Sequence, residues 1–171
     1  MVDKAKKQKS KKRYIVLCAA IVFLSIIAFG FIQFIPVGYR MTISLHGFNE
    51  NTRNIYINEN YESSTEEAVS IINEAKERVA KYFDEIESNP VIIVCDDKAK
   101  LKRLGGDHDT TTFAIFTVFS YMAISSEYLN VDVIAHELTH AETHHRAYKG
   151  KLLFQFSLPT WFDEGIALQN D

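Results

Sequence analysis

The feature that most constrains this chain is an uncharged run of 24 residues, "YIVLCAAIVFLSIIAFGFIQFIPV", at residues 14–37. At about 1.5 Å per residue, a helix of this length spans roughly 36 Å, which exceeds the roughly 30 Å thickness of a bilayer's hydrocarbon core. Buried helices of globular domains seldom run so far without a charge. The run therefore predicts one N-terminal transmembrane helix.

The charges that flank this run predict its orientation. Residues 1–13 carry seven basic side chains and one acid, whereas Arg40 is the basic residue that follows the run closely. By the positive-inside rule, this basic tail lies in the cytoplasm and residues 39–171 lie outside. A cleaved signal peptide is the alternative, because Ala28 and Gly30 offer a cleavage site, but the apolar run continues past them. We therefore expect an uncleaved signal anchor and a single-pass location in the cell membrane.

The composition of the remaining chain limits the classes of function. Of the 171 residues, those after residue 13 include 12 basic and 21 acidic side chains, a formal balance of −9, so no nucleic-acid partner is predicted. Cys18 lies in the apolar run and Cys95 outside it, so no disulfide is expected. Residues 39–171 are long enough for one domain that buries roughly two-thirds of its unfolded surface.

The start of this domain is predicted to contain two short strands. "YRMTISLH" at 39–46 alternates apolar and polar residues, which is typical of a half-buried strand. "HGFNENTRN" at 46–54 is rich in turn-forming residues, and we interpret it as a turn before a strand at 55–57.

A long amphipathic helix and further strands are predicted next. The helix begins at a capping box formed by Ser64 and Glu67 and is stopped by Pro90. The later segments are a buried strand at 91–95, a surface connection at 96–106, and one or two strands within 113–125. This order predicts an α+β domain in which helices back a mixed sheet.

The stretch "VIAHELTHAETHH" belongs to a second helix, which Asn130 can cap and Gly150 can end. His136 and His140 are four residues apart, so their imidazoles project from one face and can converge on one ion at roughly 2.0 to 2.1 Å. Glu137 lies beside them and can reach a water molecule at that ion. This is the H-E-x-x-H pattern, in which the glutamate is the general base.

A zinc site needs a third protein ligand. His144 is two turns from His136, about 12 Å along the helix axis, which is too far to share one ion. We interpret His144 and His145 as residues of the polar face. The better candidate is Glu164, in "LPTWFDEGIAL" at 158–168.

Together the two motifs resemble those of the gluzincins, the thermolysin-like and aminopeptidase-like zinc peptidases. Their first site helix carries HExxH, and the next carries a glutamate ligand in a phrase like P-x-W-[FL]-x-E-G-x-A. The matching residues of this chain are Pro159, Trp161, Phe162, Glu164, Gly165 and Ala167.

The resemblance implies a zincin-like domain, with the HExxH helix and the glutamate-ligand helix on a mixed sheet. It implies that His136, His140 and Glu164 hold Zn²⁺ and that Glu137 is the general base in hydrolysis of a peptide or protein substrate. Thermolysin-like relatives also place an acid four residues after the glutamate to orient a ligand histidine, and this chain has Leu168 there.

Two supporting roles therefore remain open in the sequence. Asp163 and Asp171 are the candidates for a residue that hydrogen-bonds to a metal-ligating side chain and orients it. The candidates for stabilising an oxyanion are Tyr121, His144, His145 and Tyr148.

Two other hypotheses remain beside peptide hydrolysis. One is a catalytically impaired or truncated zinc-holding ectodomain that binds a partner. The other is an extracytoplasmic metal-binding module, in which "DHD" at 107–109 adds weak metal affinity together with His144 and His145. Glu137 separates these hypotheses, because hydrolysis requires a general base and metal binding does not.

Overall fold

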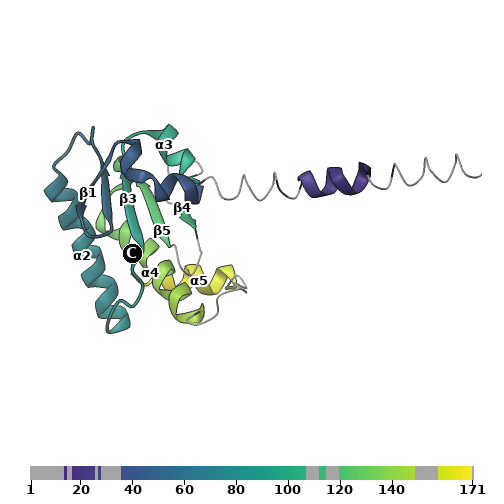
Figure 1. Ribbon diagram of the computed structural model, residues 1–171. Coiled ribbons are helices and arrows are strands. Elements are labelled where there is room, and N and C mark those ends of the chain that lie inside the picture. Colours follow the sequence, from purple (N-terminus) through teal and green to yellow (C-terminus); the bar gives the residue numbers. More distant parts are fainter. Residues whose placement is uncertain are drawn as a thin grey trace, which may run out of the picture. The chain divides into compact units, whose positions relative to one another are not determined.

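The computed structural model describes residues 14, 17–25, 27, 36–106, 112–114, 120–148 and 158–170. The chain divides into two compact units, Met1–Pro36 and Val37–Asp171. The second unit is a mixed α+β domain that contains every strand of the described chain (Figure 1).

The predicted transmembrane helix over 14–37 is corrected, because no helix among the described residues is both long enough and apolar enough to cross a bilayer. The single-pass localisation depended on this helix and is corrected with it. The basic tail at 1–13 lies outside the described residues.

The domain is built on a five-stranded mixed sheet with the order β1-β2-β3-β5-β4 (Figure 1). β2, β3 and β5 are parallel, whereas β1 and β4 pair antiparallel to their neighbours at the two edges. The strands are β1 (Phe48–Thr52), β2 (Ile55–Asn58), β3 (Val91–Cys95), β4 (Thr112–Ala114) and β5 (Tyr121–Ser125). The predicted mixed sheet is confirmed.

The central strand β3 is buried on both faces, which explains its unbroken apolar sequence. Ile92 and Val94 pack into a core shared with helices α2 (Thr65–Phe83) and α4 (Val131–Tyr148). Ile93 packs into a second core shared with Leu101 of α3 (Lys98–Arg103) and with Ile43 of the 3-10 helix η1 (Ile43–His46). The sheet therefore lies between α2 and α4 on one face and α3 and η1 on the other.

Helix α2 begins where the sequence predicts but ends earlier. The Ser64 hydroxyl accepts a hydrogen bond from the Glu67 amide at 3.3 Å, which caps the first turn. The helix ends at Phe83, and Asp84 follows with a φ of 68°. The predicted stop at Pro90 is therefore wrong, and residues 84–90 form a connection instead.

Three short segments differ from the sequence interpretation. The predicted strand at 39–46 is helical up to residue 41 and continues as η1 after Thr42. The Thr42 hydroxyl donates to the Gly38 carbonyl at 3.0 Å, and the rings of Tyr39 and His46 stack at 4.0 Å. These local contacts outweigh an alternation of apolar residues that covers only eight positions.

The other two differences concern segments interpreted as turn and loop. The predicted turn at 46–54 contains β1, an edge strand in which Phe48 alone is buried and which therefore has no alternating pattern. The predicted connection at 96–106 contains α3, whose first turn is capped because the Asp97 carboxylate accepts from the Ala99 amide at 2.7 Å.

Candidate metal centre

Helix α4 carries the HExxH residues and is fixed at its start by the predicted cap. The Asn130 side chain accepts a hydrogen bond from the Val133 amide at 2.9 Å, and Asp132 lies in the first turn. The predicted end at Gly150 lies outside the described residues. α4 packs against α2 on one side and against α5 (Thr160–Ala167) on another.

The structure brings His136, His140 and Glu164 together between α4 and α5, although they come from two separate motifs. Their ligand atoms all lie within 4.8 Å of one another. The Nε2 atoms of the two histidines are 3.1 Å apart, and Glu164 Oε2 is 3.6 Å from the Nε2 of His136 and 3.8 Å from that of His140. A tetrahedral ion at about 2.0 to 2.1 Å from each ligand would hold them about 3.4 Å apart. These three atoms therefore fit one zinc-sized ion.

The exposure of this cluster fits an open site. The side chain of His140 is 11% exposed and that of His136 is 21% exposed, whereas that of Glu164 is 51% exposed. In the described part of the chain, the group contains these three possible ligand residues and no fourth. Three protein ligands with one position open to solvent is the arrangement of catalytic zinc sites, whereas structural sites are closed by a fourth.

Asp163 lies next to this cluster, in the first turn of α5. Its Oδ1 is 3.1 Å from His140 Nδ1, and its Oδ2 is 2.9 Å from His144 Nε2. Burial raises the pKa of Asp163, but the neighbouring His144 and His140 outweigh this effect and lower the pKa, so the carboxylate is ionised at neutral pH. Of the two candidates for orienting a ligand, Asp163 therefore contacts the proposed ligand His140, whereas Asp171 lies outside the described residues.

Glu137, the predicted general base, follows His136 directly on α4 and is partly buried. Successive residues of a helix are about 100° apart around the axis, so its carboxylate starts beside the ligand face rather than on it. This position suits a group that acts on a molecule at the ion rather than on the ion itself.

The four oxyanion candidates are placed differently from one another. Tyr121 is fully buried in β5, its hydroxyl donates to the Leu104 carbonyl at 2.6 Å, and burial raises its pKa to about 12. His145 faces Glu87, with 3.9 Å between ring nitrogen and carboxylate. His144 contacts Asp163, and the ring of Tyr148 lies 5.9 Å from that of His144. Tyr121 and His145 are thus directed away from the ligand cluster.

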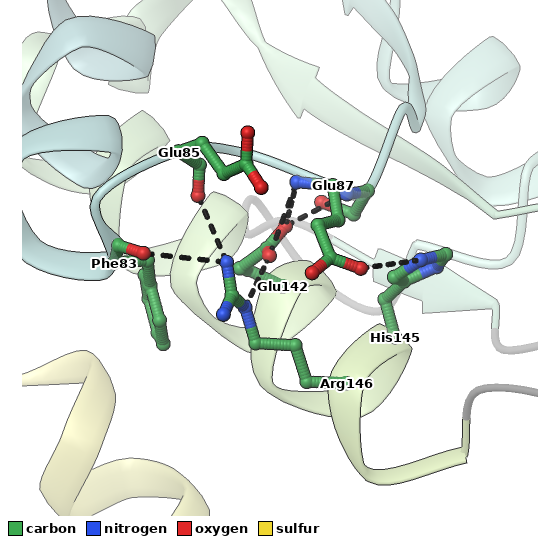
Figure 2. Close-up of polar contacts among 7 residues, drawn as sticks. Phe83, Glu85, Glu87, Glu142, His145 and Arg146 are labelled. Carbon is green, nitrogen blue, oxygen red and sulfur yellow. Dashed lines mark hydrogen bonds and ion pairs between the residues drawn. The ribbon is translucent and has the colours of Figure 1, made fainter.

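The opposite face of α4 carries a polar cluster that the sequence interpretation missed (Figure 2). Glu142 is 0% exposed, and its carboxylate accepts from the amides of Glu87 and Ser88 at 3.1 and 2.8 Å and from Arg146 Nε at 2.6 Å. Burial raises the pKa of Glu142, but these hydrogen bonds outweigh it and lower the pKa. Each acceptor oxygen is supplied with donors.

Arg146 extends this cluster to the end of α2 (Figure 2). Its Nη2 donates to the carbonyls of Phe83 and Glu85 at 3.3 and 3.0 Å, and its guanidinium lies 5.2 Å from the centre of the Phe83 ring. The four-residue spacing of Glu142 and Arg146 on a helix is a signal by which the sequence could have indicated this pair. The cluster holds the connection after α2 against α4.

The "DHD" segment at 107–109, which we considered as a weak metal site, lies outside the described residues. Searches against protein-family models, curated proteins and solved structures found no match for this chain.

Proposed function

We propose that this protein is a zinc-dependent peptidase with a gluzincin-like ligand set. The observation that carries the proposal is the convergence of one atom each from His136, His140 and Glu164 within 4.8 Å, at separations that suit a single ion. Two imidazoles and one carboxylate are a known donor set of catalytic zinc, and imidazole nitrogen favours zinc over magnesium or calcium.

A bound zinc ion supplies Lewis-acid chemistry, because it polarises a carbonyl oxygen and makes water acidic enough to lose a proton near neutral pH. In the proposed reaction Glu137 accepts that proton as water attacks a peptide carbonyl, and later donates it to the departing amine. His136, His140 and Glu164 hold the ligand geometry from two helices, and Asp163 supports His140 from behind.

The first test is the zinc content of the purified full-length chain. We expect one zinc per chain, and we expect replacement of His136, His140 or Glu164 by Ala to abolish it, because each removes one of three ligands. His145→Ala is the matched control, since this histidine of the same helix faces Glu87 instead. The assignment is wrong if Glu164→Ala retains full zinc occupancy and affinity.

A second candidate function is a metal-holding protein that binds a partner without hydrolysis. The observation that favours it is that Tyr121 and His145, two candidates for stabilising an oxyanion, are engaged elsewhere. Incubation of the zinc-loaded chain with a broad peptide library separates the two functions. Cleavage that is lost in Glu137→Gln supports the peptidase, and zinc binding without any cleavage supports the partner-binding protein.

A further inference from the structure

His144 is a buried histidine on the same face of α4 as the proposed ligand His140, one helical turn further along. It is 8% exposed, and its Nε2 lies 2.9 Å from Asp163 Oδ2. An ionised carboxylate only accepts hydrogen bonds, so the ring N–H of His144 is the donor. A histidine that is four residues beyond the HExxH motif is thereby directed at α5.

The other oxygen of the same carboxylate lies against His140. Asp163 Oδ1 is 3.1 Å from His140 Nδ1, close enough for a hydrogen bond but not aligned as one. Neither atom has another hydrogen-bond partner among the described residues, and both are buried. A small rotation of the imidazole would complete this bond. Asp163 therefore links an imidazole of the ligand set to an imidazole outside it.

We propose that His144 is a positioning residue of the metal centre. By holding Asp163, it fixes the carboxylate that orients His140, so that Nδ1 of His140 carries the proton and Nε2 presents its lone pair to the ion. This inference rests on the metal binding proposed at His136, His140 and Glu164. Such outer partners fix the orientation and tautomer of a ligand histidine, and losing one typically lowers metal affinity about 10- to 100-fold.

The position of Asp163 explains why a second contact matters. Its side chain is 18% exposed and belongs to α5, a helix of eight residues, whereas both histidines belong to α4. Without a donor on Oδ2, the carboxylate can rotate away from His140 towards solvent. With His144 in place, Asp163 is held at Oδ2, and its Oδ1 stays 3.1 Å from Nδ1 of His140.

Zinc affinity of the full-length chain, measured by competition with a chromophoric chelator, tests this role with two amide variants. His144→Gln places an amide nitrogen close to the position of Nε2 and keeps the donor to Asp163, whereas the shorter His144→Asn cannot reach it. We expect His144→Asn to bind zinc about tenfold more weakly than wild type and His144→Gln to bind nearly as tightly. His145→Asn, on another side of α4, is the control and should leave the affinity unchanged. Equal affinities of His144→Asn and wild type would overturn the inference.

The tautomer of His140 in the zinc-free protein gives a readout that does not depend on metal. Long-range proton–nitrogen NMR of the imidazoles, assigned with a His140→Gln variant, identifies the protonated nitrogen. We expect the Nδ1–H form in wild type and a mixture of both forms in His144→Asn and in Asp163→Asn. His144→Ser, which is also too short to reach Asp163, replaces His144→Asn if that variant does not fold.

These two measurements separate the inference from the proposed function. A wild-type chain that binds no zinc contradicts the proposed function, and the tautomer of His140 still decides the role of His144. An unchanged tautomer in every folded His144 variant that lacks the donor would overturn the inference even in a zinc enzyme.

Discussion

Each of two faces of α4 has a glutamate beside it, and the two glutamates have different surroundings. On one face, Glu142 is fully buried and accepts from two backbone amides and from Arg146 (Figure 2). On the other, the side chain of Glu164 from the neighbouring helix α5 is 51% exposed and faces the ring nitrogens of His136 and His140 on α4 at 3.6 and 3.8 Å. One carboxylate is surrounded by donors, whereas the other converges with atoms that offer lone pairs to a cation.

This difference separates a structural acid from a candidate ligand more clearly than residue type does. A buried carboxylate that receives several charge-assisted or backbone hydrogen bonds stabilises the fold, and both of its oxygens already face donors rather than an ion. A carboxylate and two imidazoles that converge on one point are stabilised when a cation occupies that point. Substitutions on one face should therefore change the stability of the fold, and substitutions on the other should change metal binding or hydrolysis.

The largest effect is expected from Glu137→Gln on the ligand face. The amide is nearly isosteric with the carboxylate and the three ligands are untouched, so zinc content and fold should be retained. Loss of general-base catalysis should lower kcat 10²- to 10⁴-fold, or about 3 to 5 kcal/mol of barrier, with little change in KM. Steady-state kinetics on a cleaved peptide measures this. Turnover equal to wild type would remove Glu137 from the mechanism.

On the opposite face, Glu142→Ala should destabilise the fold by about 3 kcal/mol, because two backbone amides and Arg146 lose their acceptor. Urea unfolding monitored by circular dichroism measures the free energy of unfolding. Glu74→Ala, at an exposed position of α2, is the control and should change stability by less than about 0.5 kcal/mol. If Glu142→Ala unfolds at the same urea concentration as wild type, the contrast between the faces is wrong.

Metal removal should affect stability through the ligand face alone. With free zinc at a hundredfold excess over Kd, bound zinc should raise the free energy of unfolding by about 2.7 kcal/mol, and a chelator should reverse this. Glu164→Ala should show no such shift, whereas folded Glu142→Ala should keep it from a lower starting stability. A zinc-dependent shift that survives in Glu164→Ala would place the ion elsewhere.

The smallest effect is expected from Tyr121→Phe, which tests a residue that the sequence alone left as an oxyanion candidate. Loss of the hydrogen bond to Leu104 should cost about 1 kcal/mol at neutral pH and leave zinc binding and hydrolysis unchanged. Because burial raises the pKa of Tyr121 to about 12, its contribution is complete below its unfolded pKa of about 10 and is lost as pH rises towards 12. Between pH 9 and 12, the free energy of unfolding should therefore fall less steeply with pH in the variant than in wild type. A drop in kcat would return Tyr121 to the site.

Much of the site could be predicted because its signals are local and periodic. The four-residue spacing of His136 and His140 on a capped helix directs both rings to one side, and the second motif supplies Glu164 at a place where α5 meets α4. The buried strand β3 and the start of α2 at Ser64 follow from equally local patterns.

The remaining features depend on contacts that one sequence does not display. The role of Asp163 depends on the packing of α5 against α4, and a polar-face interpretation of His144 misses that this face is covered. The buried carboxylate of Glu142 accepts from the amides of residues 87 and 88, which are more than 50 positions away in the sequence. The prediction of an N-terminal transmembrane helix is an error of the opposite kind. There a strong local signal, the apolar run, led to a prediction that the described residues do not support.

Because the proposed ligand set is divided between α4 and α5, a bound ion would link these two helices. His140 and Glu164 are 24 positions apart in the sequence, and both cysteines are free thiols, so no disulfide closes this loop. An isolated helix of eight residues is too short to persist in water, so α5 depends on what holds it to α4. Loss of the ion would remove one of the ties between α5 and α4, so α5 would open at a lower free energy than the sheet and α2.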